Sequence, residues 1–205
     1  MAFSAEALEM ADANIKLIQT PVPDNSEEPD TPLPTLILEA LTLKNVKLDY
    51  QSKKDKIAID AHFSNLYTEI PKFNVQENDL NIDQLDLKDS KINIYTETET
   101  NTVSNSTEAT TQANQKITWP EYQMVFKDLN LENNTLGFYV GNQTIKKGVF
   151  NPNAILLNNL TLKSESVFLK DKTADIKIES LKLKEASGYQ LHNLNLDADI
   201  TDTYL

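Results

Sequence analysis

Cysteine and arginine are both absent from the 205 residues, and each absence excludes a class of chemistry. Without cysteine the chain has no disulfide, no thiol nucleophile and no zinc–thiolate site. All 19 basic residues are lysines. The chain therefore lacks the planar guanidinium group of arginine, which usually binds phosphate and carboxylate through two N–H groups at once. The four glycines are fewer than an α/β enzyme normally needs for phosphate loops and tight turns.

Positive charge is also scarce, because 31 acidic residues oppose the 19 lysines and the net charge is -12. Neither nucleic acid nor an anionic membrane surface attracts a chain of this charge, so we expect no nucleic-acid partner. No stretch approaches the roughly 18 apolar residues of a membrane span. Residues 1–10 carry neither the basic nor the apolar region of a secretory signal.

What the sequence does contain is one short phrase written six times: a leucine, any residue, a second apolar residue, a polar gap, then apolar residues at alternate positions. Three consecutive copies begin at Leu41, Leu85 and Leu129, 44 residues apart each time. Such repeats stack so that neighbours complete one continuous core, which predicts a single elongated domain over residues 1–205. The copies are Leu8/Met10 with Ile15/Leu17, Leu41/Leu43 with Val46/Leu48, Leu85/Leu87 with Ile92/Ile94, Leu129/Leu131 with Leu136/Phe138, and, more weakly, Leu160/Leu162 with Val167/Leu169 and Leu181/Leu183 with Tyr189/Leu191.

Apolar and polar residues alternate along most of the chain, as in residues 57–63 and 194–200. Period two is typical of half-buried strands, so we predict an all-β fold, with a short helical turn only at residues 64–70. In five of the six copies the step across the polar gap is an odd number of residues, for example from Leu43 to Val46, which would put the two residues on opposite faces of an unbroken strand. Either a turn between two strands or a bulge must therefore bring the apolar residues after the gap back to the same face of the sheet as those before it. We expect each phrase to be a pair of short strands.

Two segments do not fit a sheet. Residues 20–34 hold five of the eight prolines, and residues 96–116 are a polar tract of Thr, Asn, Ser, Gln and Glu. Neither buries enough apolar surface to offset the entropy lost on ordering, so we predict two disordered insertions. Trp119 follows the second tract, and we interpret it as an aromatic that seals the edge of the sheet core rather than a binding residue.

The best candidate for a metal site is weak. Asp79, Asn81 and Asp83 match the opening of a calcium loop, but Gln84 stands where that loop needs glycine and Ser90 where it needs glutamate. The simpler interpretation places these polar residues on the solvent-exposed face of a strand. We therefore predict no metal site and no cofactor.

Catalytic residues are equally hard to find. His62 and His192 are the only histidines, and no Gly-x-Ser-x-Gly elbow presents a nucleophile to them. We interpret Asp197, Asp199 and Asp202 as solvated strand residues. The prediction is that the chain is not an enzyme; a carbohydrate-active β-helix enzyme is the minor alternative, because a pair of carboxylates among the 31 acids would serve it.

Four strings in order resemble a known family. They are WPEY at 119–122, FKDLNLENN at 126–134, KGVFNPN at 147–153 and LKEASGYQL at 183–191. They resemble the N-terminal half of the TamB translocation and assembly module proteins of Bacteroidota and, more broadly, the AsmA-like superfamily. The resemblance covers about residues 36–205, and it is the order of the strings, not any single one, that is specific.

The resemblance implies a long periplasmic protein, held in the inner membrane by an N-terminal helix that this chain lacks. It also implies a curved β-sheet trough, often called a β-taco, that crosses towards the outer membrane. Family members are linked to outer-membrane biogenesis, as phospholipid transport between the membranes and as assembly of outer-membrane proteins with a BamA-like partner. On this basis we expect an internal fragment, monomeric, whose partners are phospholipid acyl chains or outer-membrane protein clients. The BamA-like protein would bind through a C-terminal part absent from this chain.

The residues lead to a similar expectation. An apolar sheet face without helices to cover it must fold onto itself or line a groove. We predict that the polar face holds Thr42, Asp86 and Asn130. A purely structural β-solenoid spacer or adhesin-like repeat, with a closed dry interior, is the alternative to a groove. The candidate lipid-groove residues are Leu41, Leu43, Leu85, Leu87, Leu129, Leu131, Ile92 and Phe138.

Overall fold

The computed structural model describes residues 2–20, 35–74, 79–97 and 123–201, and within these ranges the protein is all-β, with no helix. Eleven strands form one sheet. The strands are β1 (Ala2–Ala11), β2 (Asn14–Gln19), β3 (Thr35–Ser52), β4 (Ile57–Glu69), β5 (Lys72–Asn74), β6 (Asp79–Lys88), β7 (Lys91–Thr96), β8 (Gln123–Val140), β9 (Ala154–Lys170), β10 (Thr173–Glu185) and β11 (Gln190–Thr201).

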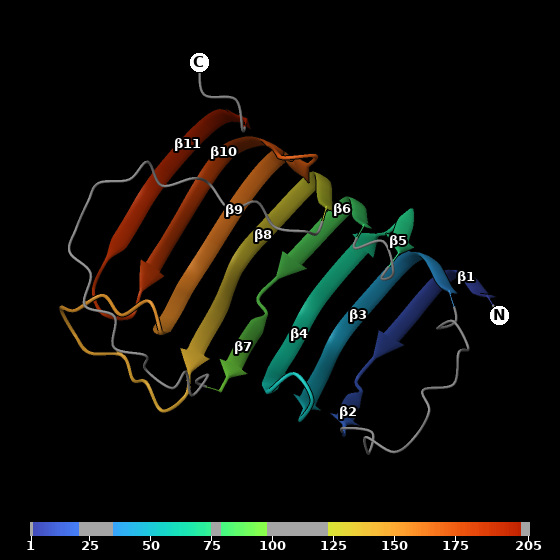
Figure 1. Cartoon of the computed structure of the whole chain (residues 1–205), viewed down its shortest axis with the longest axis horizontal. Helices are drawn as coiled ribbons and strands as arrows, with labels where there is room; N and C mark the ends of the chain where they lie inside the picture. The colour runs from blue at the N-terminus through green and yellow to red at the C-terminus, as the bar shows by residue number, and fades with distance from the viewer. Residues whose placement is uncertain (1, 21–34, 75–78, 98–122, 202–205) are drawn as a thin grey trace, which may run out of the picture.

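The strands follow the order β1-β3-β4-β6-β8-β9-β10-β11 across the sheet, so β1 and β11 lie at opposite ends (Figure 1). Strand β2 continues β1 beside β3, and β7 continues β6 between β4 and β8. The neighbours β1/β3 and β6/β8 are parallel, whereas all other pairs along this path are antiparallel. Parallel neighbours need long crossover connections, and here these run between β2 and β3 and between β7 and β8.

Both crossover connections coincide with the predicted insertions, 20–34 and 96–116. Most of each segment lies outside the described residues, as do Trp119 and Asp202. Thr96 departs from the prediction, because it is the last residue of β7 and pairs with Val140 and Ile57.

The same three-strand arrangement occurs twice. A strand broken in two, β1/β2, lies parallel to the long β3, which is followed by the antiparallel β4. In the same way β6/β7 lies parallel to the long β8, which is followed by the antiparallel β9. Parallel partners come from successive copies of the repeated phrase, so Leu85 pairs with Leu129 and Ile92 pairs with Leu136.

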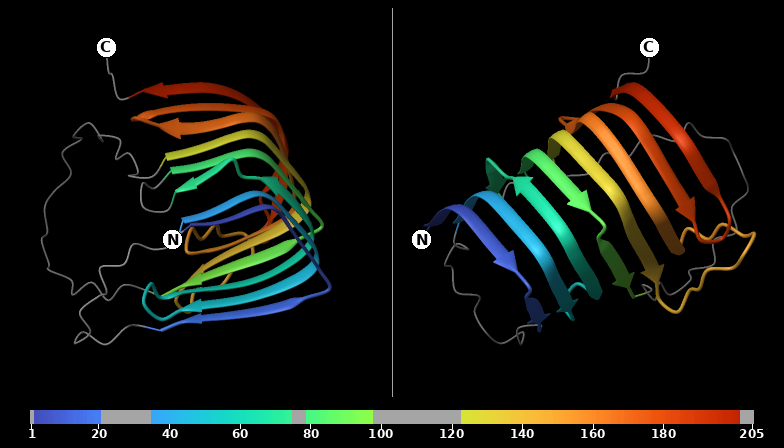
Figure 2. Two further views of the ribbon diagram at one scale, coloured as in Figure 1. Left: turned by 90° about the vertical axis from the view of Figure 1, so that its right-hand side faces the viewer. Right: turned by 180° about the vertical axis from the view of Figure 1, so that it is seen from behind.

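The sheet is bent (Figure 2). A series of residues with left-handed backbone conformation links neighbouring strands. Asp12, Asn45, Asp89, Asn133 and Asn159 all have φ between 50° and 53°. Apart from glycine, Asn and Asp adopt this conformation at the lowest cost, because their short polar side chains bond locally. Here those side chains bond one another, with Nδ2–Oδ1 distances of 2.6 Å for Asn45–Asp12, 2.6 Å for Asn133–Asp89 and 2.9 Å for Asn159–Asn133.

The left-handed residues account for the odd step across the polar gap in the first four copies of the phrase. Leu43 and Val46 flank Asn45, and both are buried, so the backbone turn at Asn45 keeps the two on one side. The predicted pair of short strands is present in β1/β2 and β6/β7. In β3 and β8 the strand continues through the left-handed residue, so the bulge, the other possibility, applies there.

The helical turn predicted at residues 64–70 is wrong. Residues 65–69 belong to β4 and pair with β3 on one side and with β6 on the other. Two ladders satisfy the backbone groups of this segment, which outweighs its weak local preference for helix.

Candidate functional site

One row of apolar side chains crosses the whole sheet, with one residue on each of the eight strands of the main path. We call it the leucine row. Its continuity means that each repeat places an equivalent side chain against its neighbour. The row consists of Met10, Leu43, Leu66, Leu87, Leu131, Leu162, Leu181 and Leu194.

A second row lies two residues away along each strand, or three in β10, where the register shifts between Ile178 and Leu181. It contains Leu8, Leu41, Thr68, Leu85, Leu129, Ser164, Ile178 and Leu196. Two of its members are buried hydroxyl residues. The Ser164 hydroxyl donates to the carbonyl of Lys177 at 2.7 Å, whereas the Thr68 hydroxyl has no hydrogen-bond partner among the described residues. The row is therefore less apolar than the leucine row.

Beyond the bend two further rows complete the surface, which we call the apolar face. The eight predicted groove residues all lie in these four rows: Leu43, Leu87 and Leu131 in the leucine row, Leu41, Leu85 and Leu129 in the second, Ile92 in the third and Phe138 in the fourth. The third row is Ile15, Leu48, Ala61, Ile92, Leu136 and Leu157, and the fourth is Leu17, Tyr50, Ile59, Ile94, Phe138 and Ile155.

Burial varies strongly over the apolar face. Leu43 and Leu87, beside the bend, are only 8% and 7% exposed, whereas Phe138 is 37% exposed and Leu17 is 52% exposed. Side chains beside the bend pack on their neighbours and behave as a core. Leu17, on the edge strand β2, and Phe138 keep apolar surface that a bound molecule would cover, whereas the other members of the fourth row are half-buried.

A buried amide holds the bend at the break between β6 and β7. The Asn134 side chain is fully buried, accepts from the Ser90 N–H at 2.9 Å and donates to the Leu87 carbonyl at 2.7 Å. The Ser90 hydroxyl in turn accepts from the Ser64 N–H at 3.0 Å. These bonds replace ladder bonds that the break removes. Sequence reasoning missed them, although an asparagine at the position where the phrase beginning at Leu41 carries Val46 was a visible signal.

The polar face carries ion pairs between neighbouring strands, typical of a solvated sheet surface. Nζ–carboxylate distances are 2.6 Å for Lys163–Glu179, 2.8 Å for Lys88–Glu132 and 3.3 Å for Lys16–Asp49. A hydrogen bond from Lys177, followed by its charge, lowers the pKa of Glu165, and the same contact raises the pKa of Lys177. The Glu132 and Glu179 carboxylates likewise raise the pKa of Lys88 and Lys163.

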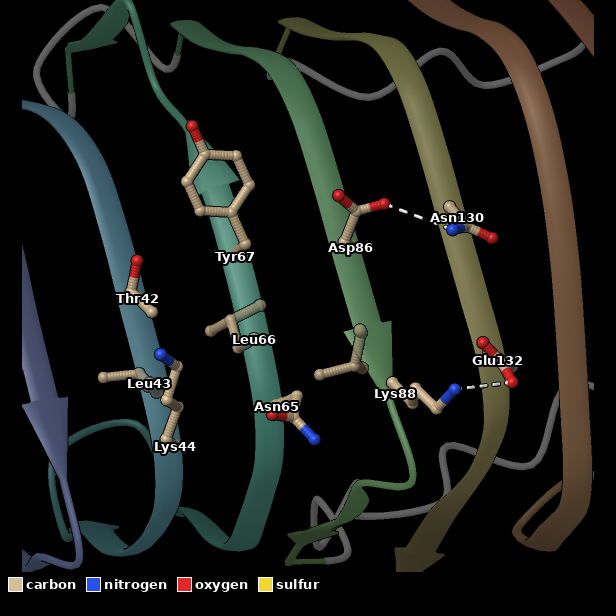
Figure 3. A pocket seen from close by; sticks show the side chains of 11 residues that line it. Thr42, Leu43, Lys44, Asn65, Leu66, Tyr67, Asp86, Lys88, Asn130 and Glu132 are labelled. Atoms are coloured by element: carbon tan, nitrogen blue, oxygen red, sulfur yellow. Dashed lines mark hydrogen bonds and ion pairs between the residues drawn. The ribbon is translucent and has the colours of Figure 1, made fainter.

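A shallow pocket of about 250 Å³ lies over β3, β4, β6 and β8 and is lined mainly by polar-face side chains (Figure 3). It contains Thr42, Asp86 and Asn130, the three residues predicted for that face. The Asn130 amide donates to Asp86 at 3.2 Å, beside the Lys88–Glu132 pair. Because these groups bind each other, the pocket presents paired side chains rather than a nucleophile and its base.

The candidate metal and catalytic residues are scattered. Asn81 and Asp83 lie in β6, and Asp83 binds Lys127. The His62 ring nitrogen Nε2 lies 3.1 Å from Asn45 Oδ1, whereas His192 lies far along the sheet in the edge strand β11. In the described ranges no three His, Cys, Asp or Glu side chains are grouped to hold a metal ion. Asp197 and Asp199 are exposed strand residues of β11.

Two of the four family-like strings come together at one end of the sheet. The Gly148 N–H donates to the Ser187 carbonyl at 2.6 Å, and the rings of Phe150 and Tyr189 meet edge to face at 6.0 Å. Glu185, buried nearby, accepts from the Ser187 N–H at 2.8 Å. These contacts join the β8–β9 connection to the turn before β11, a pairing that spacing alone did not indicate.

No helix in the described part of the chain has the length and apolarity to cross a membrane. Comparisons with protein-family models, with curated proteins and with solved structures found no match to this chain.

Proposed function

We propose that this chain is a segment of a periplasm-spanning β-trough, a curved array of repeats that binds acyl chains along its apolar face. In this proposal it acts in outer-membrane biogenesis, as phospholipid transport between the inner and outer membranes or in the assembly of outer-membrane proteins. An inner-membrane anchor and the BamA-like partner would belong to parts of a longer protein. The chain itself would perform no catalysis. The resemblance to TamB and AsmA-like proteins supports this assignment.

The observation that carries the proposal is the unbroken leucine row. With neighbouring strands about 4.8 Å apart, eight strands give a row roughly 34 Å long, comparable with the hydrocarbon core of a bilayer. Each strand offers nearly the same side chain as the last. Leu43 and Leu87 of this row are buried and form the base of the apolar face. An acyl chain that lies over the face would meet similar apolar side chains on successive strands, so no single position would trap it.

The exposed members of the apolar face are the expected contact points. Leu8, Leu17 and Phe138 are each more than one-third exposed, as is Leu196 in the edge strand β11. Covering their apolar surface would stabilise a complex by about 25 cal/mol for each Å² removed from water. Polar groups that would oppose an acyl chain lie mainly on the other face.

Lipid analysis tests the proposal. The chain would be exported to a bacterial periplasm, purified without strong detergent, and its retained lipids measured by mass spectrometry. We expect phospholipid with the wild-type chain and much less with Leu8, Leu17 and Phe138 changed to aspartate together. Replacing the exposed polar-face residue Asn130 by aspartate is the control and should leave retention unchanged. Equal lipid content in all three samples would rule out the apolar face as the binding surface.

A structural spacer is the second candidate, favoured by one observation. Val46 is fully buried, and Leu43 and Leu87 are nearly so, which means that part of the apolar face already packs against itself. A spacer requires no ligand, so it predicts a chain that is folded and free of lipid. The same mass spectra therefore separate the two functions.

A further inference from the structure

One row of the polar face changes abruptly in side-chain size. It lies one residue from the fourth row of the apolar face and contains Gln51 of β3, Ala58 of β4, Tyr95 of β7 and Tyr139 of β8, each opposite the next. Neighbouring strands lie about 4.8 Å apart, so Gln51 and Tyr95 stand roughly 9.6 Å apart with the methyl group of Ala58 between them. The small residue leaves a slot between two large ones.

A cavity of about 340 Å³ occupies this slot, and we call it the tyrosine cavity. Gln51, Ala58 and Tyr95 line it, and the turn between β3 and β4 and the start of the β8–β9 connection, including Asn142, extend it beyond the strand ends. Its volume falls within the range of roughly 300 to 1,000 Å³ that is typical of small-molecule sites. Strands β3, β4 and β7 each have a neighbour on both sides, so the cavity belongs to the interior of the sheet.

Tyr95 is a fixed wall of the tyrosine cavity. Its ring stacks on the ring of Tyr139, with the centroids 5.2 Å apart and the planes 15° apart. Tyr139 in turn lies over Gly137, where an added Cβ atom would be 2.8 Å from Tyr139 Cε2. Tyr139 therefore covers one side of the Tyr95 ring, while Tyr95 borders the cavity and is 41% exposed. The stack orients an aromatic ring whose other side is available to a ligand, which lowers the entropy cost of binding.

Two lysines give the tyrosine cavity a positive charge. Lys53 and Lys56 lie in the turn between β3 and β4 and both line the cavity, and neither forms an ion pair with a described residue. The acid of the same turn, Asp55, instead accepts a hydrogen bond from the Ser52 hydroxyl at 2.7 Å. Glu97 is the one acid among the lining residues. The lining is therefore positive in a chain whose net charge is -12, which favours a ligand with a negative charge.

An aromatic wall, side-chain amides and two cations together suit one chemical class. The C–H bonds of a six-membered sugar ring pack on an aromatic face, and its hydroxyls exchange hydrogen bonds with amides such as those of Gln51 and Asn142. We propose that the tyrosine cavity binds an acidic sugar unit of a polysaccharide, with the sugar ring on Tyr95 and its carboxylate towards Lys53 and Lys56. Cell-wall glycan and acidic surface polysaccharides both contain such units. The site lies on the polar face, so it does not depend on what the apolar face binds.

NMR titration of the full chain with three sugars tests the ligand class. The probes are the cell-wall disaccharide of N-acetylglucosamine and N-acetylmuramic acid, a galacturonic acid trimer, and chitobiose, which resembles the first probe but lacks its carboxylate. We expect an acidic probe to shift the Tyr95 ring signals and to bind about two- to five-fold more tightly than chitobiose. The acidic probe that binds more tightly identifies the source of the sugar. No shift at Tyr95 with either acidic probe, or equal affinity for chitobiose, would overturn the proposal.

Matched variants test the site itself. Tyr95→Ala removes the aromatic wall and Ala58→Leu fills the slot, so each should weaken binding of the acidic sugar by about tenfold. Ala7→Leu, at an exposed position on the polar face of β1, is the control for the added leucine and should bind normally. Lys56→Gln should weaken the acidic sugar by roughly two- to five-fold and leave chitobiose unchanged, whereas Lys54→Gln, in the same turn but outside the lining, should alter neither.

Circular dichroism of each variant checks that the sheet is intact. Ala58→Leu adds a side chain at a half-exposed position and keeps the Tyr95–Tyr139 stack, so it tests the slot even if Tyr95→Ala unfolds the chain. A folded Ala58→Leu variant with unchanged affinity, or equal losses in Lys56→Gln and Lys54→Gln, would contradict binding at the tyrosine cavity.

Discussion

The side-chain amide of Asn134 accepts a hydrogen bond from the backbone N–H of Ser90 at 2.9 Å, from a residue 44 positions earlier in the chain. The same amide donates to the carbonyl of Leu87 at 2.7 Å. One side chain therefore satisfies two backbone groups at the point where β6 ends and β7 begins. This contact joins consecutive copies of the phrase at the bend of the sheet.

Replacing Asn134 by leucine tests the value of that contact. The change leaves two buried backbone groups without partners, and we expect it to lower the free energy of unfolding by about 2 to 4 kcal/mol. Urea denaturation monitored by circular dichroism measures the loss. Asn130→Leu, at an exposed position of the same strand, is the control and should stay within about 0.5 kcal/mol of the wild type. Equal losses in the two variants would show that the Asn134 bonds contribute little.

The left-handed conformation at Asn159 gives a second prediction. Its φ is 51°, a value that glycine adopts freely and β-branched residues adopt only with strain. Asn159→Val should therefore be less stable than Asn159→Gly by about 1 to 2 kcal/mol, since the two variants lose the same bond to Asn133 and differ in backbone strain. Thermal unfolding of the pair checks this. If valine proved as stable as glycine, the bend would not depend on this conformation.

Gly137 gives a third prediction, because a Cβ atom at this position would lie 2.4 Å from Asn93 Oδ1 and 2.8 Å from Tyr139 Cε2. Gly137→Ala should cost about 1 to 3 kcal/mol of stability through overpacking. Removing the obstructing amide in the double variant Gly137→Ala with Asn93→Ala should recover part of that loss. A double-mutant cycle from urea curves measures the recovery, and strictly additive effects would argue against the close approach.

Charged substitutions on the apolar face should divide into two classes. Leu87→Lys buries a charge at a position only 7% exposed, so it should destabilise by several kcal/mol and reduce protein abundance. Phe138→Lys, at a position 37% exposed, should leave the chain folded and lower the retained phospholipid. Asn130→Lys is the polar-face control for both. Abundance and lipid content falling together in Phe138→Lys would favour a closed core over a groove.

The Glu165–Lys177 pair predicts a pH dependence. Because the hydrogen bond from Lys177 holds the pKa of Glu165 below its ordinary value of 4.5, the pair stabilises the fold above that value and loses its effect as the pH falls through the lowered pKa. The raised pKa of Lys177 has the opposite sense: its contribution is complete below the ordinary 10.5 and disappears as the pH rises through the raised value. Both groups are solvated, so the effect is small. The Glu165 carboxyl titration by NMR, compared between wild type and Lys177→Gln, measures it; identical titrations would exclude the pair.

The all-β fold was predictable because period two is a local property: Leu85 and Leu87 reach the same side of a strand whatever lies beside it. The 44-residue spacing matches the parallel register of β6 and β8, in which Leu85 pairs with Leu129 and Leu87 with Leu131. The odd step across five of the gaps required a turn or a bulge, and in four of them an Asn or Asp residue in the left-handed conformation allows it. The phrase could not show which strands would break, since β3 and β8 continue through the same kind of gap that divides β6 from β7.

Chain sequence by itself determined the strands, the alternation of the two faces and the sites of the crossover connections, because these depend on residue type and short spacing. Only the tertiary structure decided how buried each leucine is, since the bend and the neighbouring strands cover Leu43 and Leu87 and leave Phe138 and Leu17 exposed. It also decided that Asn134 meets Ser90 and that Phe150 meets Tyr189. Such contacts depend on strand order and register, which arise from pairing between distant segments, and no local pattern encodes that pairing.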